Sequence, residues 1–337
     1  MAPSATAIDI HAHYYPAEFL NLVAAEGGRF GATCRETGNG PVVDVGPLHA
    51  GPIAAKFIDL DLRLAAMDEQ RVAVQALSLT QPMVYWADEA TSRRLSASFN
   101  DALVDANAHS PERLFGLAML PMQCPREALL ELDRVAAAPG IRGIYMGTAI
   151  GDMPLSDPSL LAVFERIESL GLAVFLHPLK VIGMEDRLSE YFLANLLGNP
   201  FDTAAAAAHL MFGGVLDRFP ALQIVLPHAG GALPYLAGRL AHGWRVRPEC
   251  AHLPRSPLEY LNRFHYDTIA HSDAALKFLI DLVGAERVLL GSDYCFDMGY
   301  DQPVRVIEVH PDLDDVGRDL ISGGNARRLI GLAHTCE

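Results

Sequence analysis

Two histidines separated by one residue lie at the end of the first apolar run of the chain, in Asp9-Ile10-His11-Ala12-His13. Alternate residues of a β-strand point to the same side, so a strand at this position places both imidazoles on one face. Imidazole nitrogen is a common ligand of divalent metal ions, and two imidazoles on a stiff strand form half of a metal site. Taken alone, the pair is equally compatible with histidines that have a structural role.

Three later apolar runs also end in residues that can bind a metal ion, namely His177, His228 and Asp293. Together with the first pair, they offer several neutral imidazoles and one carboxylate, a set that suits zinc, manganese or iron. The alternative makes His177 and His228 buried structural histidines and Asp293 the N-cap of a helix. That alternative fits any one of these residues better than it fits all five.

Eight short apolar or β-branched runs predict β-strands, and longer helical patterns separate them. Nearly continuous apolar runs are typical of parallel strands that are covered on both faces. The predicted strands are residues 8–13, 72–79, 114–120, 141–146, 172–177, 223–228, 265–269 and 288–293. Eight strands that alternate with helices over 337 residues predict an α/β fold, a (β/α)8 TIM barrel. In this fold the carboxyl ends of the strands form the active site, so the histidines and Asp293 are expected to converge.

The connection after the first predicted strand is unusually long and contains the turn sequence Thr37-Gly38-Asn39-Gly40. Residues 33–36 and 42–45 flank this turn and predict a small inserted β-hairpin, within an insertion at about 28–52. We find no internal repeat and no run typical of a linker. We therefore expect a single barrel domain over residues 1–337.

Composition excludes several classes of function. The net charge of −15 argues against nucleic acid as a partner, because phosphate binding requires a basic surface. The most apolar helical stretch, residues 204–216, is interrupted by His209 and by Gly213-Gly214, so we expect no membrane span. The five cysteines include no C-x-x-C pair and predict no disulfide framework. These features favour a cytoplasmic protein with no nucleic-acid or membrane partner.

The order of several short segments resembles the amidohydrolase superfamily and, within it, a branch of metal-dependent decarboxylases. The resemblance extends from Ile8 to about Leu332. It is carried by Ile8-Asp9-Ile10-His11-Ala12-His13, Val74-Gln75-Ala76-Leu77-Ser78, Leu120-Pro121-Met122-Gln123, Met211-Phe212-Gly213-Gly214-Val215, His228-Ala229-Gly230-Gly231-Ala232, His242-Gly243-Trp244, Leu290-Gly291-Ser292-Asp293-Tyr294 and Gly324-Asn325-Ala326. The H-x-H pair alone marks only the superfamily, whereas the ordered set is specific to the branch.

The resemblance implies a role for each residue of the predicted site. One divalent metal ion, with zinc favoured and manganese as the alternative, would be bound by His11, His13, His177 and Asp293. His228 would be the catalytic acid–base group, and Asp293 would also be able to move a proton. Residues 142–147, at the end of the fourth predicted strand, contain no lysine. Binuclear members carry a carboxylated lysine there, so the resemblance implies a mononuclear site.

The resemblance also suggests residues that bind the substrate, a small carboxylic acid. It places a carboxylate-binding arginine at Arg239, supplied by the neighbouring subunit of a homodimer or higher homo-oligomer; the alternative is an exposed arginine in a surface ion pair. No arginine occupies Leu48-His49-Ala50-Gly51, where a second substrate-binding arginine is expected, and His49 or Lys56 would have to replace it. Trp86, after the second predicted strand, either lines the substrate pocket or packs on the barrel rim.

We therefore expect a nonoxidative decarboxylase of an aromatic or unsaturated carboxylic acid, acting in the catabolism of aromatic compounds. The alternative is a metal-dependent hydrolase or hydratase that opens a lactone or hydrates an unsaturated acid with the same site. A third hypothesis is a noncatalytic metal-binding protein on a barrel that has lost activity. Release of CO2 from a carboxylated substrate separates the first hypothesis from the second.

Overall fold

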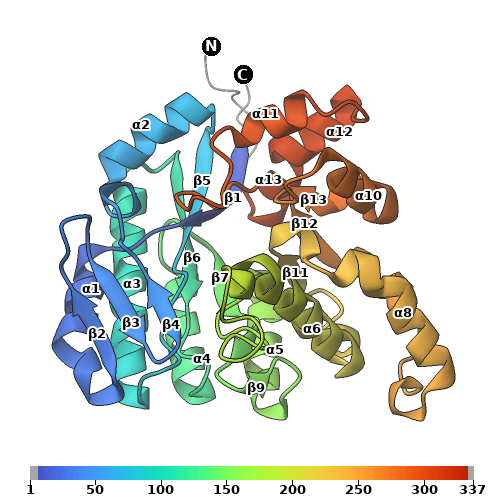
Figure 1. Cartoon of the computed structure of the whole chain (residues 1–337), viewed down its shortest axis with the longest axis horizontal. Coiled ribbons are helices and arrows are strands. Elements are labelled where there is room, and N and C mark those ends of the chain that lie inside the picture. Colours follow the sequence, from blue (N-terminus) through green and yellow to red (C-terminus); the bar gives the residue numbers. More distant parts are fainter. Residues whose placement is uncertain (1–6, 333–337) are drawn as a thin grey trace.

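The computed structural model describes residues 7–332 and contains a nearly closed barrel of eight parallel strands, surrounded by helices (Figure 1). The strand order is β1-β5-β6-β7-β10-β11-β12-β13. The bounds are Ile8–His13, Val74–Ser78, Leu114–Met119, Ile141–Gly147, Ala173–His177, Gln223–Leu226, Phe264–Asp267 and Val288–Leu289. A parallel bridge between Ala12 and Tyr294 brings the last strand segment against the first. The predicted TIM barrel is confirmed.

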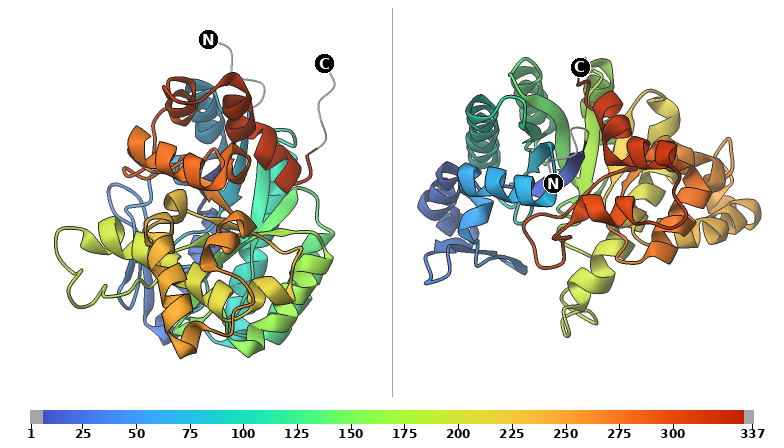
Figure 2. Two further views of the ribbon diagram at one scale, coloured as in Figure 1. Left: turned by 90° about the vertical axis from the view of Figure 1, so that its right-hand side faces the viewer. Right: turned by 90° about the horizontal axis from the view of Figure 1, so that it is seen from above.

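The helices cover the outside of the barrel (Figures 1 and 2). They are α1 Ala17–Glu26, α2 Leu60–Gln70, α3 Glu89–His109, α4 Pro125–Ala136, α5 Leu161–Ser169, α6 Asn199–Phe212, α7 Val215–Arg218, α8 Leu233–Val246, α9 Pro257–Tyr260, α10 Asp273–Val283, α11 Pro303–Glu308, α12 Asp315–Asp319 and α13 Asn325–Leu329. Several begin at side chains that satisfy free backbone N–H groups: Asp59 caps α2 and Asp88 caps α3. Within residues 7–332, no helix has the length and hydropathy needed to cross a lipid bilayer.

The predicted hairpin after the first strand is present and belongs to a three-stranded antiparallel sheet. Its strands are β2 Ala32–Arg35, β3 Val42–Val45 and β4 Leu48–Ala50. The third strand has only three residues, too few to show the alternation that identifies a strand in a sequence. For the same reason the short hairpin of β8 Ala149–Ile150 and β9 Met153–Pro154 could not be predicted from the sequence.

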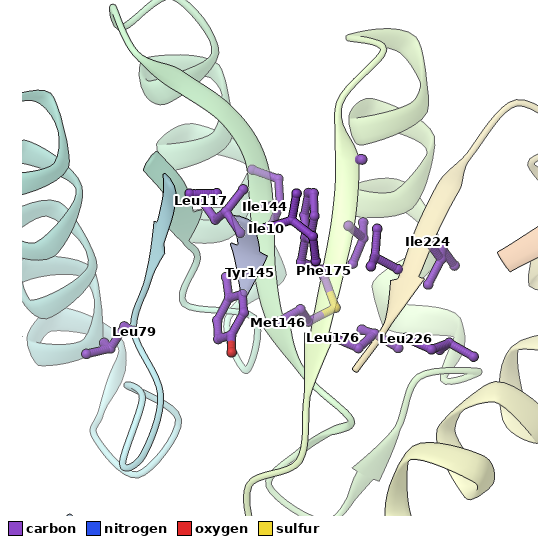
Figure 3. Packing of buried hydrophobic residues seen from close by; sticks show 14 of the residues in the cluster. Ile10, Leu79, Leu117, Ile144, Tyr145, Met146, Phe175, Leu176, Ile224 and Leu226 are labelled. Atoms are coloured by element: carbon purple, nitrogen blue, oxygen red, sulfur yellow. The ribbon is translucent and has the colours of Figure 1, made fainter. Parts of the chain in front are cut away.

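Buried apolar side chains of neighbouring strands pack against one another and against the helices around the barrel (Figure 3). Leu117, Ile144 and Ile224 are fully buried, and Phe175 is nearly so. Gly143 leaves room for this packing, because a Cβ atom there would lie 2.7 Å from the ring of Phe175. The packed interior supports the carboxyl ends of the strands, where the predicted site lies.

Three strands, β11, β12 and β13, end at least two residues earlier than the sequence predicts. The chain leaves β11 after Leu226 and β13 after Leu289, although the apolar runs extend to residues 228 and 293. His228 and Asp293 have φ angles of 53° and 59°, in the left-handed region that a strand does not use. The backbone therefore turns out of the sheet at the two residues with the most direct role in the predicted chemistry.

Candidate active site

The barrel brings together the four residues that the sequence analysis assigned as metal ligands and His228, which it assigned as the acid–base group. The ring centroids of His11, His13, His177 and His228 lie 5.0–5.5 Å from their neighbours in the cluster. The carboxylate of Asp293 lies among them, with Oδ1 2.9 Å from His13 Nε2 and 3.6 Å from His11 Nε2. Its Oδ2 lies 3.9 Å from His228 Nε2. The cluster occupies the carboxyl ends of four strands.

Hydrogen bonds at the Nδ1 atoms of His11, His13 and His177 orient the Nε2 atoms of these rings. The Nδ1 of His177 lies 2.8 Å from the carbonyl oxygen of the next residue, which only accepts, so this nitrogen carries the proton. The Nδ1 of His11 lies 2.7 Å from Asp267, and that of His13 lies 3.2 Å from Ser78. These contacts fix the rings and leave the Nε2 atoms available to a metal ion.

The donor set fits a divalent cation. One ligand atom each from His11, His177, His228 and Asp293 lies within 4.8 Å of all the others. The Nε2 of His11 is buried and has no hydrogen-bond partner within residues 7–332, which is costly unless a ligand engages it. His13 lies against the same carboxylate and is fully buried, whereas the His228 side chain remains 15% exposed. Geometry alone therefore admits either His13 or His228 as the third imidazole.

The protonation states of His13, His177, His228 and Asp293 also suit a metal ion. Burial lowers the pKa of His13 to about 4 and holds the pKa of His177 well below its ordinary value. Burial, together with the nearby His11, also lowers the pKa of His228. Burial opposes ionisation of Asp293, but the hydrogen bond to His13 and the surrounding histidines outweigh it and lower its pKa. At neutral pH these three imidazoles are neutral and the carboxylate is ionised, the states in which they bind metals. For His11, burial lowers the pKa, but the hydrogen bond to Asp267 and the nearby carboxylates outweigh it and raise the pKa.

The amidohydrolase family model matches residues 8–332. The chain belongs to this family. It is 35% identical over 329 residues to 2-amino-3-carboxymuconate-6-semialdehyde decarboxylase of Dictyostelium discoideum, covering 96% of this chain and 91% of the relative. The assignment of the chain to the decarboxylase branch is therefore confirmed.

Solved structures of decarboxylases share the fold of this amidohydrolase. The 5-carboxyvanillate decarboxylase of Sphingomonas paucimobilis is 29% identical, with a TM-score of 0.86 over 98% of this chain and all of that one. A dihydroxybenzoic acid decarboxylase of Polaromonas sp. JS666, solved with bound manganese and the inhibitor 2-nitroresorcinol, is 24% identical. It has a TM-score of 0.80 and covers 97% of each chain.

A further carboxylate, Asp267 at the end of β12, holds the amidohydrolase site together and was not singled out from the sequence. Its Oδ2 accepts hydrogen bonds from His11 Nδ1 and from the backbone N–H of His228, at 2.7 Å and 2.9 Å. Its Oδ1 accepts from the N–H groups of Ala229 and Ile269, at 2.7 Å and 3.0 Å. Asp267 lies in the middle of the predicted strand 265–269, whereas the observed strand ends at Asp267, so the strand-end signal that identified Asp293 did not identify Asp267.

We predict that Asp267→Asn lowers metal affinity by about 10–100-fold, the usual cost of losing a partner behind a metal-binding histidine. The amide keeps the shape of the side chain, but its neutral oxygen is a weaker acceptor for the His11 ring. The dissociation constant of zinc, measured by competition with a chromophoric chelator, checks this. Asp301→Asn, at an exposed position, is the control. Unchanged affinity in Asp267→Asn would contradict the assigned role.

A buried network behind the site joins the first and last strands. Asp9 accepts hydrogen bonds from the backbone N–H of His11 at 3.0 Å, from Gln75 at 2.9 Å and from the Ser292 hydroxyl at 2.5 Å. Arg63 is fully buried and donates to Gln75 at 2.7 Å and to the carbonyl oxygen of His13. The network fixes the backbone of both histidines of the H-x-H pair.

The structure places the three predicted substrate-binding residues in different environments. His49, on β4, lines a cavity that reaches the metal cluster, and its Nδ1 lies 2.6 Å from Asp44. Trp86 packs edge-on against Phe30, and its indole N–H donates to a backbone carbonyl at 3.0 Å. Two cavities open at the cluster of histidines and Asp293, and Trp86 lines neither of them. Arg239 is exposed on α8 and makes no ion pair within residues 7–332.

Two cavities, of about 550 and 390 Å³, meet at the cluster, and His228 and Asp293 line both. The larger cavity runs between α8 and α10, past Tyr235 and Phe278. The smaller one runs toward the inserted sheet and contains His177 and His49. His228 therefore faces the space where a substrate can bind, whereas His13 lies behind it and lines neither cavity.

Proposed function

We propose that this amidohydrolase is a metal-dependent, nonoxidative decarboxylase of an aromatic or unsaturated carboxylic acid, acting in the catabolism of aromatic compounds. The observation that carries the proposal is a buried cluster of imidazoles and one carboxylate that opens, at His228, into two cavities. The relatives named above are decarboxylases, which favours this reaction over hydrolysis or hydration at the same site.

We assign His11, His13, His177 and Asp293 as the ligands of one divalent ion and leave His228 free for catalysis. The full burial of His13 and the partial exposure of His228 support this division. Zinc is our first choice because imidazole and carboxylate ligands suit it, and manganese is the alternative because a structural neighbour binds it. The bound ion supplies positive charge that attracts and polarises the oxygen atoms of a substrate carboxylate or hydroxyl.

His228 is the group we assign to proton transfer. When CO2 leaves, the carbon that carried it keeps the electron pair of the broken bond and must gain a proton. His228 lines both cavities, and its ring nitrogen lies 3.9 Å from Asp293, through which a proton can be exchanged. Because the pKa of His228 is lowered, its imidazole is neutral at neutral pH and acts as a base. It must take up a proton before it can pass one to the substrate carbon.

We further propose that the chain forms a homodimer or higher homo-oligomer, in which Arg239 of one subunit binds the reacting carboxylate in the other. Its guanidinium is exposed and has no ion-pair partner within the described chain. A guanidinium suits a carboxylate because it donates two parallel hydrogen bonds. We keep the cytoplasm as the proposed location and one domain over residues 1–337 as the proposed organisation.

We predict that Arg239→Gln raises the KM for the substrate by about 10–100-fold, the loss of a charge-assisted hydrogen bond, and leaves metal content unchanged. Steady-state kinetics and metal analysis measure both effects. Arg245→Gln, at another exposed position of α8, is the matched control. A verified monomer with full activity would rule out the shared site.

The experiment that tests the proposed reaction is CO2 release by the metal-reconstituted protein across hydroxylated aromatic and unsaturated carboxylic acids. We expect release with at least one acid and its loss after chelation. Silence across the panel, with metal bound, would reject the decarboxylase and favour hydrolysis of a lactone or hydration of an unsaturated acid.

A further inference from the structure

Two asparagines lie where the two cavities meet. Asn195 and Asn199 line both cavities, as do His228, Asp293 and Met298. A molecule held next to His228 therefore has these carboxamides on an adjoining wall, whichever cavity receives the rest of it. Neither asparagine belongs to the metal cluster, and neither has a part in the proposed proton transfer.

The carboxamide of Asn199 lines the cavities and has no hydrogen-bond partner in the described chain. The residue is only 8% exposed. Its amide atoms are open to the two cavities, so a ligand bound there can donate hydrogen bonds to them and accept hydrogen bonds from them. The Asn195 side chain, half-buried, also has no hydrogen-bond partner in this part of the chain.

The backbone holds these two residues firmly beside His228. Asn195 lies in the π-helix η4, Ala194–Gly198, which continues directly into α6. π-Helical turns occur frequently at functional sites because they redirect side chains. The N–H of Ala232, just after the His228 turn, donates to the carbonyl oxygen of Pro200 at 3.0 Å. Figure 2 shows the segment before the π-helix η4, in yellow-green, projecting from the barrel.

The charges around the cavities decide what these amides can recognise. No lysine or arginine lines either cavity within the described chain. His49, where the family resemblance expects an arginine, is held by Asp44, and Asp297 adds negative charge to the smaller cavity. A second substrate carboxylate would therefore meet no cation there. A hydroxyl or carbonyl group matches a carboxamide, which both donates and accepts hydrogen bonds.

We propose that Asn195 and Asn199 recognise a neutral hydroxyl or carbonyl substituent of the substrate, and so select acids with such a group over acids with a second carboxylate. The position of the reacting carboxylate, beside His228 and bound by the partner's Arg239, rests on the proposed function. The two carboxamides themselves do not react.

Isothermal titration of the metal-reconstituted protein tests the proposal with benzoate, the three monohydroxybenzoates and benzene-1,3-dicarboxylate as probes. We expect at least one hydroxybenzoate to bind about tenfold more tightly than benzoate, the value of one or two neutral hydrogen bonds. Asn199→Leu, close in volume, should abolish this preference and leave the affinity for benzoate within about twofold. Asn195→Leu, at a less buried position, is the second variant and should reduce the same preference.

Leu197→Ala is the matched control, because Leu197 lies in the same π-helix and lines neither cavity; it should keep the preference. Tighter binding of the dicarboxylate than of every hydroxybenzoate, or a preference that survives both asparagine variants, would overturn the proposal. If the preference depends on Asn199 but no acid releases CO2, the proposed reaction is wrong and the recognition site stands. If CO2 is released but the preference is unchanged in both asparagine variants, the reaction stands and the recognition site is wrong.

Discussion

Replacing His228 with asparagine is expected to lower the decarboxylation rate by about 10²–10⁴-fold, the usual contribution of a general acid–base group, while the metal stays bound. Asparagine cannot carry a proton between substrate and solvent at neutral pH. It tolerates a φ angle near 53° better than most residues, so the backbone turn should survive. The rate of CO2 release and the metal content of the purified protein are the two measurements.

The metal content is the decisive part of this experiment, because His228 lies close enough to the cluster to be a ligand. Lost activity with full metal content supports proton transfer by His228 and ligation by His13. Lost metal would show instead that His228 is a ligand. Retention of both metal and full activity would contradict either role. His109→Asn, at an exposed histidine bonded to Asp61, controls for the substitution itself.

Asp293→Asn is expected to weaken metal binding by more than about 100-fold, because this carboxylate is the only anion among the four assigned ligands. Loss of a residue that only hydrogen-bonds a ligand, such as Asp267, costs about 10–100-fold. An amide supplies a neutral oxygen and does not offset the charge of a divalent ion. Asparagine also accepts the left-handed backbone conformation at residue 293, where φ is 59°. We expect the rate of CO2 release to fall by about three orders of magnitude, in line with the several kcal/mol that a bound metal contributes.

Metal titration followed by activity at saturating metal separates the two effects of this substitution. If saturating metal restores the rate fully, Asp293 acts only as a ligand. A remaining defect at full occupancy indicates a second role in exchanging protons with His228, 3.9 Å away. Metal affinity equal to that of the unchanged protein would contradict the ligand assignment. Asp301→Asn again serves as the control.

The fold could be predicted from the sequence because apolar runs and helical patterns alternate along the chain. Buried parallel strands must be apolar along their whole length, so eight apolar runs separated by helical patterns were visible without any tertiary information. The first strand was predicted with its observed bounds, Ile8–His13. Short strands such as β4 carry no such signal, and the apolar runs before His228 and Asp293 concealed the points where the chain leaves the sheet.

The sequence by itself determined which residue types end the strands, and hence that imidazoles and one carboxylate gather at one end of a barrel. Only the tertiary structure decided how they are arranged. The contact of His11 with Asp267 joins residues 256 positions apart, and that of His13 with Asp293 joins residues 280 positions apart. Local sequence patterns carry no information about such pairs, because the closure of the barrel sets which strand ends face each other. The same closure turns His228 toward the cavities, buries His13 behind it and brings Asn199 to the wall beside them.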